Sequence, residues 1–524
     1  MTRCEVLTQN ICEVDADALV VGLFAAPQGD SRESGGQAGN GAAVYTASAL
    51  EVENATSGAV SRVLATGDFT GTRGEIVVIY GPEGVKARRV ILAGLGAIDA
   101  FNEEAFAEVH RKIAAAARGS SIVLTSEDFI PETRDARWAA RTALRVMLFE
   151  KTPVKSFKSS ARPAPQLESV VWFSEDEAAR GELLAALEEG CVCAEAMRIA
   201  KNLGDLPPNE CTPQHMYETA CRIRDAVEGA LTGEEAARPA VTVEVMRRED
   251  LEKAGMGGIL AVGRGSDVEP LLIEFSWWGA ADRKAAPIVV VGKGVTFDAG
   301  GLNLKPGRSM PEMKYDMSGA AAALALVKMA ADLRLPLNVV ALAPCAENLP
   351  SGRALKPADI IRMGNNMTVE VLNADAEGRL LLADALYRAQ RLNPAACVDV
   401  ATLTGACVVA LGTNISGLFC SSSELTAELT TAAESADDPV WPMPMGGRYR
   451  ELLKSNCADL VNTGNQPHSG ASTAATFLQA FAPKCPWAHL DVAGTANTTG
   501  ADRQSTARPL PLLMEWLLAR AQRA

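Results

Sequence analysis

Histidine is scarce in this sequence, and the catalytic motifs that depend on it are missing. Only four of the 524 residues are histidines: His110, His215, His468 and His489. They form no H-E-x-x-H pair, which argues against a histidine-based zinc protease. The phosphate-binding pattern G-x-x-x-x-G-K-[ST] and the G-x-S-x-G elbow are absent as well. The sequence therefore favours neither P-loop phosphoryl transfer nor the serine-hydrolase route.

Long apolar runs and paired cysteines are also lacking. The 12 cysteines are scattered without a C-x-x-C pair, and no run approaches the 18 or more apolar residues of a membrane span. Scattered thiols favour a reducing compartment. Glu5, Glu13, Asp15 and Asp17 lie where a signal peptide would need a positive start and an uninterrupted apolar stretch. We therefore expect a cytoplasmic protein without membrane contact.

No part of the chain carries an excess of positive charge. The net charge is −14, and residues 1–165 contain 18 basic and 20 acidic side chains. Binding of nucleic acid by counterion release requires a clustered positive surface. The charge distribution therefore argues against a nucleic-acid partner.

Length and local pattern divide the chain into two α/β domains. A chain of 524 residues exceeds one ordinary core. The segment 151–165 is basic and rich in proline and serine, which is typical of a linker or exposed loop, and the Gly- and Ser-rich segment 28–41 is expected to be a mobile loop. We therefore expect an N-terminal α/β domain at 1–165, a linker helix region at 166–200 and a C-terminal domain at 201–524.

The expected elements come from short apolar runs and longer helical patterns. Strand-like runs in the N-terminal domain lie at 18–24, 75–80 and 89–92, with a helical pattern at 105–118. A long helical pattern at 178–202 follows the linker segment. These patterns predict two domains, each with a mixed or mostly parallel sheet flanked by helices.

The most informative feature of the sequence is a set of acidic residues and lysines at predicted strand ends. Lys293 and Asp298 follow the buried strand pattern at 287–291, within a glycine-rich stretch that we expect to turn tightly. Asp375 and Glu377 follow a second strand pattern, and residues two apart in an extended turn point the same way. Carboxylates suit Mg²⁺ or Mn²⁺, and Zn²⁺ also accepts oxygen ligands. This pattern predicts a two-metal site with ions roughly 3.5–4 Å apart at the strand ends of the C-terminal domain.

Three neighbouring residues have simpler interpretations from the residues alone. Asp316 precedes an alanine-rich helical pattern and could be its N-cap. Lys305 precedes Pro306 and could be a solvated turn residue, and Arg379 could pair with Glu377 or Asp384. The local pattern leaves these alternatives open.

At these residues the sequence resembles the M17 leucyl aminopeptidase family. The resemblance is carried by Gly292-Lys-Gly-Val-Thr-Phe-Asp-Ala-Gly-Gly301, by Asn373-Ala-Asp-Ala-Glu-Gly-Arg-Leu380 and by the intervening Met313-Lys-Tyr-Asp-Met-Ser-Gly-Ala-Ala321. It spans roughly residues 195–500. It implies a metal-dependent aminopeptidase that hydrolyses the N-terminal residue, preferably leucine-type, from peptides by means of a metal-bound hydroxide.

The resemblance implies a role for each residue of the group. Lys305 would polarise the scissile carbonyl, and Arg379 would hold a bicarbonate that acts as general base. Asp298 and Glu377 would bridge two divalent ions (Zn²⁺, Mn²⁺ or Co²⁺). The full ligand set would be Lys293, Asp298, Asp316, Asp375 and Glu377.

Substrate and subunit contacts are also implied by the resemblance. Leu403, Thr404 and Gly405 would contact the peptide backbone, Met313 would line the pocket for the first side chain, and the protein would be a homo-hexamer. The segment 465–471 departs from the Gly-rich stretch usual in the family. An alternative function is DNA binding or a scaffold role of an M17-like hexamer, against which the charge balance and the intact site residues argue.

Overall fold

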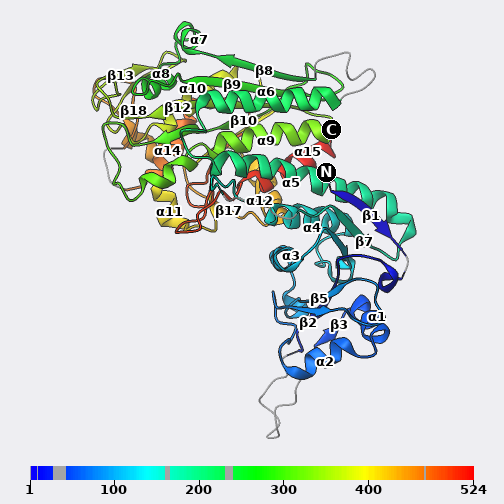
Figure 1. Ribbon diagram of the computed structural model, residues 1–524. Coiled ribbons are helices and arrows are strands. Elements are labelled where there is room, and N and C mark those ends of the chain that lie inside the picture. Colours follow the sequence, from blue (N-terminus) through cyan, green and yellow to red (C-terminus); the bar gives the residue numbers. More distant parts are fainter. Residues whose placement is uncertain are drawn as a thin grey trace. The chain divides into compact units, whose positions relative to one another are not determined.

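The computed structural model describes residues 2–8, 10–27, 43–159, 166–230, 240–464 and 468–523. The expected mobile loop at 28–41 and the end of the basic segment, 160–165, lie outside these ranges. The chain divides into two compact units, Met1–Glu195 and Ala196–Ala524 (Figure 1). Both units have helices packed on mixed, mostly parallel sheets, so the expected α/β class is confirmed.

The first unit is built on one sheet with the strand order β1-β7-β6-β2-β5-β4, and β3 pairs with β2. Among these described strands, β3 and β4 are the antiparallel ones. Every residue of β2 is buried, because its apolar side chains enter the cores on both faces of the sheet. The strands are β1 (Arg3–Leu7), β2 (Ala18–Phe24), β3 (Val44–Tyr45), β4 (Ile76–Tyr80), β5 (Arg89–Gly94), β6 (Ser121–Leu124) and β7 (Ser169–Phe173).

Helices cover both faces of this sheet. The core on one face includes residues of α3, α4 and α5, and the core on the other includes residues of α1 and α2. Because β7 pairs with β1 and β6, the sheet continues past residue 165, where the sequence placed the end of the domain. The helices are α1 (Ala47–Ala55), α2 (Ala59–Thr66), α3 (Glu103–Ala116), α4 (Ala136–Glu150) and α5 (Arg180–Asp205).

Helix α5 begins in the first unit and ends in the second. Leu183 and Leu187 pack into a core of the first unit. Near the other end, the buried Lys201 donates to Asp205 Oδ2 at 2.9 Å, and the backbone N–H of Ser505 donates to Asp205 Oδ1 at 2.7 Å. The expected linker region at 166–200 therefore consists largely of a sheet strand and a continuous helix.

The second unit contains a larger sheet with the order β17-β16-β19-β15-β10-β12-β9-β8, and β11 pairs with β12. Its central strands β19, β15, β10 and β12 are parallel. A small sheet has the order β13-β14-β18. The strands are β8 (Val241–Met246), β9 (Leu271–Trp278), β10 (Ile288–Gly292), β11 (Gly294–Asp298), β12 (Asn338–Asn348), β13 (Ile360–Arg362), β14 (Thr368–Glu370), β15 (Ala396–Ala401), β16 (Ser416–Cys420), β17 (Val440–Pro442), β18 (Leu460–Val461) and β19 (Trp487–Asp491).

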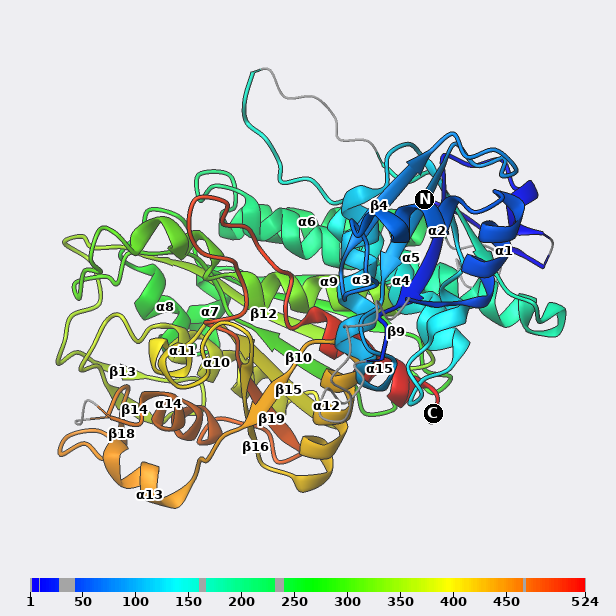
Figure 2. The same ribbon diagram turned by 90° about the horizontal axis from the view of Figure 1, so that it is seen from below.

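The helices of the second unit lie on both faces of the large sheet (Figure 2). α8, α10 and α14 share a core with Val289 and Val291 of β10. α9 contacts the same strand but has no residue in that core, so it covers the opposite face together with α6. The helices are α6 (Pro213–Ala230), α7 (Arg248–Lys253), α8 (Gly257–Gly263), α9 (Ser318–Asp332), α10 (Gly378–Gln390), α11 (Gly405–Leu411), α12 (Ser423–Ala436), α13 (Gly447–Arg450), α14 (Gly470–Gln479) and α15 (Leu510–Ala521).

No helix within the described ranges combines the length and the apolar character that crossing a membrane requires.

The buried His110 should make the stability of the first unit depend on pH. The ring is fully buried: Nδ1 lies 2.7 Å from the Phe106 carbonyl oxygen, to which it donates, and Nε2 lies 2.8 Å from Ser126 Oγ, from which it accepts. Burial lowers the pKa of His110 to about 4. In the unfolded chain the pKa of His110 is about 6.5. Between pH 6.5 and pH 4 the unfolded chain therefore binds a proton that the folded chain does not bind. Stability present above pH 6.5 should be lost as the pH falls toward 4.

We expect this single group to lower the free energy of unfolding by about 2 kcal/mol between pH 7 and pH 5. Urea unfolding of the wild type and of His110→Gln at both pH values measures the effect. The glutamine variant cannot titrate, so its stability should change less with pH. Equal pH dependence in the two proteins would assign the acid sensitivity to other groups.

Candidate functional site

Two predicted site residues, and one residue that the sequence did not single out, lie at the carboxyl ends of parallel strands in the second unit. Lys293 directly follows β10, Asp298 is the last residue of β11, and Thr402 directly follows β15. Open α/β sheets place their ligands at this edge, because loops from neighbouring strands meet there. The sheet therefore brings together side chains that lie more than 100 residues apart in the sequence.

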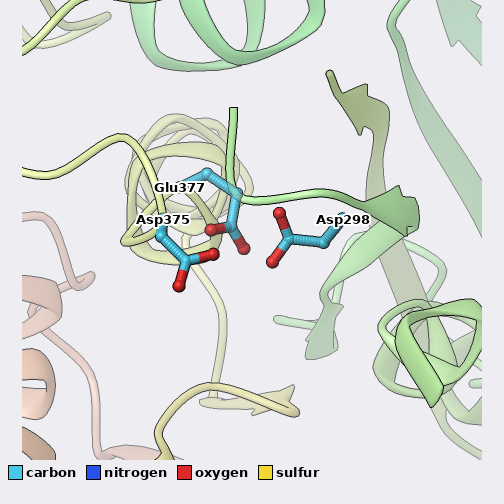
Figure 3. A group of neighbouring side chains, drawn as sticks. All are labelled: Asp298, Asp375 and Glu377. Carbon is cyan, nitrogen blue, oxygen red and sulfur yellow. The ribbon is translucent and has the colours of Figure 1, made fainter. Parts of the chain in front are cut away.

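Three carboxylates converge at this edge. Asp298 comes from the end of β11, whereas Asp375 and Glu377 come from the segment between β14 and α10 (Figure 3). Oxygen atoms of the three groups lie within 4.8 Å of one another. Asp298 and Glu377 are buried, and Asp375 is partly exposed. Carboxylates held this close repel one another unless cations lie among them.

Two lysines supply positive charge to this group. Lys293 Nζ lies 2.6 Å from Asp316 Oδ1 and 2.9 Å from Glu377 Oε1. Lys305 Nζ lies 2.9 Å from Asp298 Oδ2 and 2.5 Å from Asp375 Oδ1. Each lysine thus stands between two carboxylates. Four carboxylates share two ammonium groups, so the group retains negative charge that the lysines do not neutralise.

The electrostatics of the group follow from its burial. Burial raises the pKa of Asp298 to about 6 and that of Asp316 to about 8, and the nearby Glu377 carboxylate adds to both shifts while the lysines oppose them. Burial would also raise the pKa of Glu377, but Lys293 and Lys305 outweigh it and lower that pKa. For both lysines, burial acts to lower the pKa, and the surrounding carboxylates raise it overall. An added cation would therefore be attracted to the group and would displace protons from it.

Asp316 points toward Lys293 and does not cap α9. The N-cap of α9 is Met317, without a side-chain cap bond. Asp316 Oδ1 instead accepts from Lys293 Nζ and, at 2.8 Å, from Thr402 Oγ1. Its buried Oδ2 finds no donor among the residues that the structure describes. A buried carboxylate oxygen left without a donor fits a cation as its partner, so the donor set is compatible with divalent metal.

Glycines around Lys293 allow the side chain of Lys293 and neighbouring backbone segments to pack closely. A Cβ at Gly378 would lie 2.5 Å from Lys293 Cε, and a Cβ at Gly292 would lie 2.2 Å from the Gly319 carbonyl oxygen. The sequence predicted that Gly292 and Gly294 form tight turns, but both lie within strands and serve close packing. The turn is made by Gly300 and Gly301, which have positive φ angles of 87° and 60°.

Arg379 lies in the first turn of α10 and is buried. Its Nη1 donates to the Asn462 carbonyl oxygen at 2.8 Å, and its Nε has no acceptor within the described part of the chain. Burial lowers the pKa of Arg379 to about 10 against the opposing effect of Glu377 and Asp491, so the side chain stays charged at neutral pH. The Asp384 carboxylate is not paired with Arg379, and both of its oxygens accept backbone N–H groups.

The expected substrate-binding loop lies between β15 and α11. The N–H groups of Leu403 and Thr404 donate to Asp491 Oδ1, and Thr404 Oγ1 donates to Asp491 Oδ2 at 2.6 Å. Thr404 is also the N-cap of α11, whereas Gly405 is exposed. Met313 is partly buried in the 3₁₀ helix Met310–Tyr315, which packs against β11.

Several polar residues that the sequence did not single out hold the site together. Thr402 accepts from Lys293 through its carbonyl oxygen and donates to Asp316. Asn462 Oδ1 accepts from the N–H of Leu372, and its Nδ2 donates to the Asn373 carbonyl oxygen. Asn348, at the end of β12, donates to Asp298. The sequence pattern that could have identified these residues is a polar residue at or just after the end of an apolar strand.

Two sequence profiles match the chain. The profile described as cytosol aminopeptidase family, catalytic domain, matches residues 198–514, and that of the N-terminal domain of the same family matches residues 20–159. A probable cytosol aminopeptidase of Burkholderia ambifaria is 41% identical, over 97% of this chain and 95% of its own. One from Paraburkholderia phymatum is 42% identical, over 90% of this chain and 92% of its own.

Solved structures match over nearly the whole length. A mutant of the leucine aminopeptidase of tomato has a TM-score of 0.83 at 26% identity and covers 99% of this chain and 97% of its own. The bottromycin maturation enzyme BotP, in complex with Mn, has a TM-score of 0.79 at 29% identity and covers 97% of this chain and all of its own.

Proposed function

This chain belongs to the cytosol aminopeptidase family, and we propose that it is a metal-dependent aminopeptidase that hydrolyses the N-terminal residue, preferably leucine-type, from peptides. The observation that carries the proposal is the group of four carboxylates and two lysines at the sheet edge. The unfilled Oδ2 of Asp316 and the charge left unneutralised by the lysines support cation binding.

Five residues of this chain would hold two divalent ions. When bound, the ions would supply Lewis acidity, a water of lowered pKa and an attachment point for the free α-amine of the substrate. The similar BotP structure is a complex with Mn, which supports Mn²⁺, with Zn²⁺ and Co²⁺ as alternatives. Asp298 and Glu377 would bridge the ions. The ligand set would be Lys293, Asp298, Asp316, Asp375 and Glu377.

The two lysines differ in exposure, which supports different roles. The side chain of Lys293 is 3% exposed and enclosed by protein groups, whereas that of Lys305 is 16% exposed. Lys305 is therefore the more accessible of the two lysines to an arriving peptide. Because the carboxylates raise the pKa of Lys305, it stays protonated and can donate to the oxyanion that develops on the scissile carbonyl.

Arg379 would hold a bicarbonate that acts as general base. Its Nε is buried without a protein acceptor among the described residues, and its charge is retained at neutral pH. A small planar anion accepts two parallel N–H groups from a guanidinium, so bicarbonate fits this donor.

The loop after β15 and the 3₁₀ helix before α9 would contact the substrate. The exposed Gly405, with Leu403 and Thr404, would contact the peptide backbone, and Met313 would line the pocket for the first side chain. We also propose a cytoplasmic homo-hexamer. Light scattering on the purified protein gives the mass of the assembly. Dividing that mass by the chain mass of 55.1 kDa gives the number of subunits.

Blocking the N-terminus of the substrate should abolish cleavage. Acetylation turns the α-amine into an amide, whose nitrogen lone pair is delocalised into the carbonyl group and is no longer available to bind a metal ion. Leucine anilide and N-acetyl-leucine anilide, compared at equal concentration, test this, and a series of aminoacyl amides tests the leucine preference. Comparable turnover of free and acetylated compounds would indicate an endopeptidase or amidase instead.

A further inference from the structure

The two oxygens of Asp298 have different partners. Oδ1 accepts from the backbone N–H of Gly300 at 2.8 Å and from Asn348 Nδ2 at 2.8 Å. Oδ2 lies 2.9 Å from Lys305 Nζ. Oδ1 is therefore committed to protein donors, and only Oδ2 faces the other charged groups of the site.

Asn348 connects the two segments that carry the carboxylates. Its Nδ2 donates to Asp298 Oδ1 and, at 3.0 Å, to the carbonyl oxygen of Ala374, the residue before Asp375. Its own backbone carbonyl accepts from the N–H of Ala299 at 2.9 Å. Both partners of the side-chain nitrogen are acceptors, so the chemistry fixes which end of the amide faces them. One buried side chain thus holds the end of β11 against the segment before α10.

We propose that Asn348 is a positioning residue that directs Asp298 Oδ2 toward the ions and fixes the spacing between Asp298 and Asp375. This inference rests on the proposed two-metal function. Groups that orient metal ligands without touching the metal typically change metal affinity by 10–100-fold. Asn348 should therefore set the affinity for the ions more than the chemistry that follows.

The same strand offers a matched control. Asn338, at the opposite end of β12 and about 33 Å away along the strand, is also a buried asparagine. Its Nδ2 donates to backbone carbonyls, including that of Ala285 at 2.9 Å. Asn338→Ala thus removes a comparable buried amide from the same strand without touching the site.

The experiment measures Mn²⁺ binding by calorimetry, and metal content after dialysis, in the wild type, Asn348→Ala and Asn338→Ala. We expect Asn348→Ala to bind Mn²⁺ about 10–100-fold more weakly, whereas Asn338→Ala keeps the wild-type affinity. The Mn²⁺ concentration for half-maximal activity should rise in parallel, while the KM for the peptide at saturating Mn²⁺ stays near the wild-type value. Circular dichroism checks that both variants are folded.

The possible outcomes bear on the positioning role as follows. Unchanged Mn²⁺ affinity in Asn348→Ala would overturn the positioning role, and so would an equal loss in both variants, because general destabilisation would then explain it. If Asn348→Ala is recovered unfolded, Asn348→Ser, with its shorter hydroxyl donor, replaces it. A wild type that neither binds nor needs Mn²⁺, Zn²⁺ or Co²⁺ would refute the proposed function itself, and the positioning role with it.

Discussion

Lys305→Ala should lower kcat by about 10²–10³-fold, or roughly 3–4 kcal/mol, while metal binding is retained. The proposal places Lys305 Nζ at the developing oxyanion, so its loss affects the transition state more than the ground state. Removing an ammonium group from beside Asp298 and Asp375 also removes a competitor for cations. The metal content of the variant should therefore equal or exceed that of the wild type.

Asp298→Ala should lose both activity and metal, because the bridging carboxylate would serve both ions. Asp298→Asn is the more informative variant. The position of Oδ1 receives N–H groups from Gly300 and Asn348, so the amide oxygen must lie there and the NH₂ group must face the ions. A side chain of nearly unchanged shape would then present a donor where a ligand is needed.

Metal analysis of the purified variants separates the two roles. Lys305→Met, of similar length and without charge, serves as the matched control for the alanine variant. If Lys305→Ala emerges depleted of metal while Asp298→Asn retains both ions, the assignment of electrophile and ligand is wrong.

Exhaustive chelation should reduce activity by roughly 10²–10⁴-fold, because the proposed mechanism needs the ions to stabilise the transition state by several kcal/mol. The thermal midpoint should fall too, because ligands that bind only the folded state stabilise it by mass action. Repulsion among Asp298, Asp375 and Glu377 should then destabilise the site segments first.

Restoring single ions after chelation identifies the effective metal. Mn²⁺, Zn²⁺ and Co²⁺ are each added back, and rate and thermal midpoint are recorded together. A chelator already saturated with Ca²⁺ controls for direct effects of the chelator. Full activity in a preparation shown to be free of metal would contradict the proposed mechanism.

The sequence predicted the fold best where one local rule dominates. The buried run at 18–24 is a strand covered on both faces, and the structure has β2 at those same residues. The helical pattern at 178–202 is found as α5, shifted by two or three residues. Strand β7 was not predicted, because it lies beyond a polar, proline-rich segment and its pairing with β1 depends on contacts across the whole unit.

In the candidate site, the sequence indicated the three clustered carboxylates and missed the asparagines that hydrogen-bond to their segments. Asp298, Asp375 and Glu377 stand out because carboxylates beside glycines at strand ends are an unusual pattern, and the structure brings them together. Asn348 and Asn462 also lie at or just after strand ends, but a neutral asparagine there is a weaker signal than a carboxylate beside glycines. Their importance depends on which backbone groups of distant segments lie within hydrogen-bond distance, and this is known only once the sheet is assembled.

The continuity of α5 limits how the two units can be produced as separate fragments. A fragment beginning at Ala196, where the compact units divide, would start inside the helix and keep only its final turns. Helical segments shorter than about 12–15 residues are marginal on their own, so the buried Lys201 and Asp205 would lose the scaffold that holds them near Ser505. A fragment that carries the second unit should therefore begin before Arg180, with the exposed apolar face of the helix replaced by polar residues at Leu183 and Leu187.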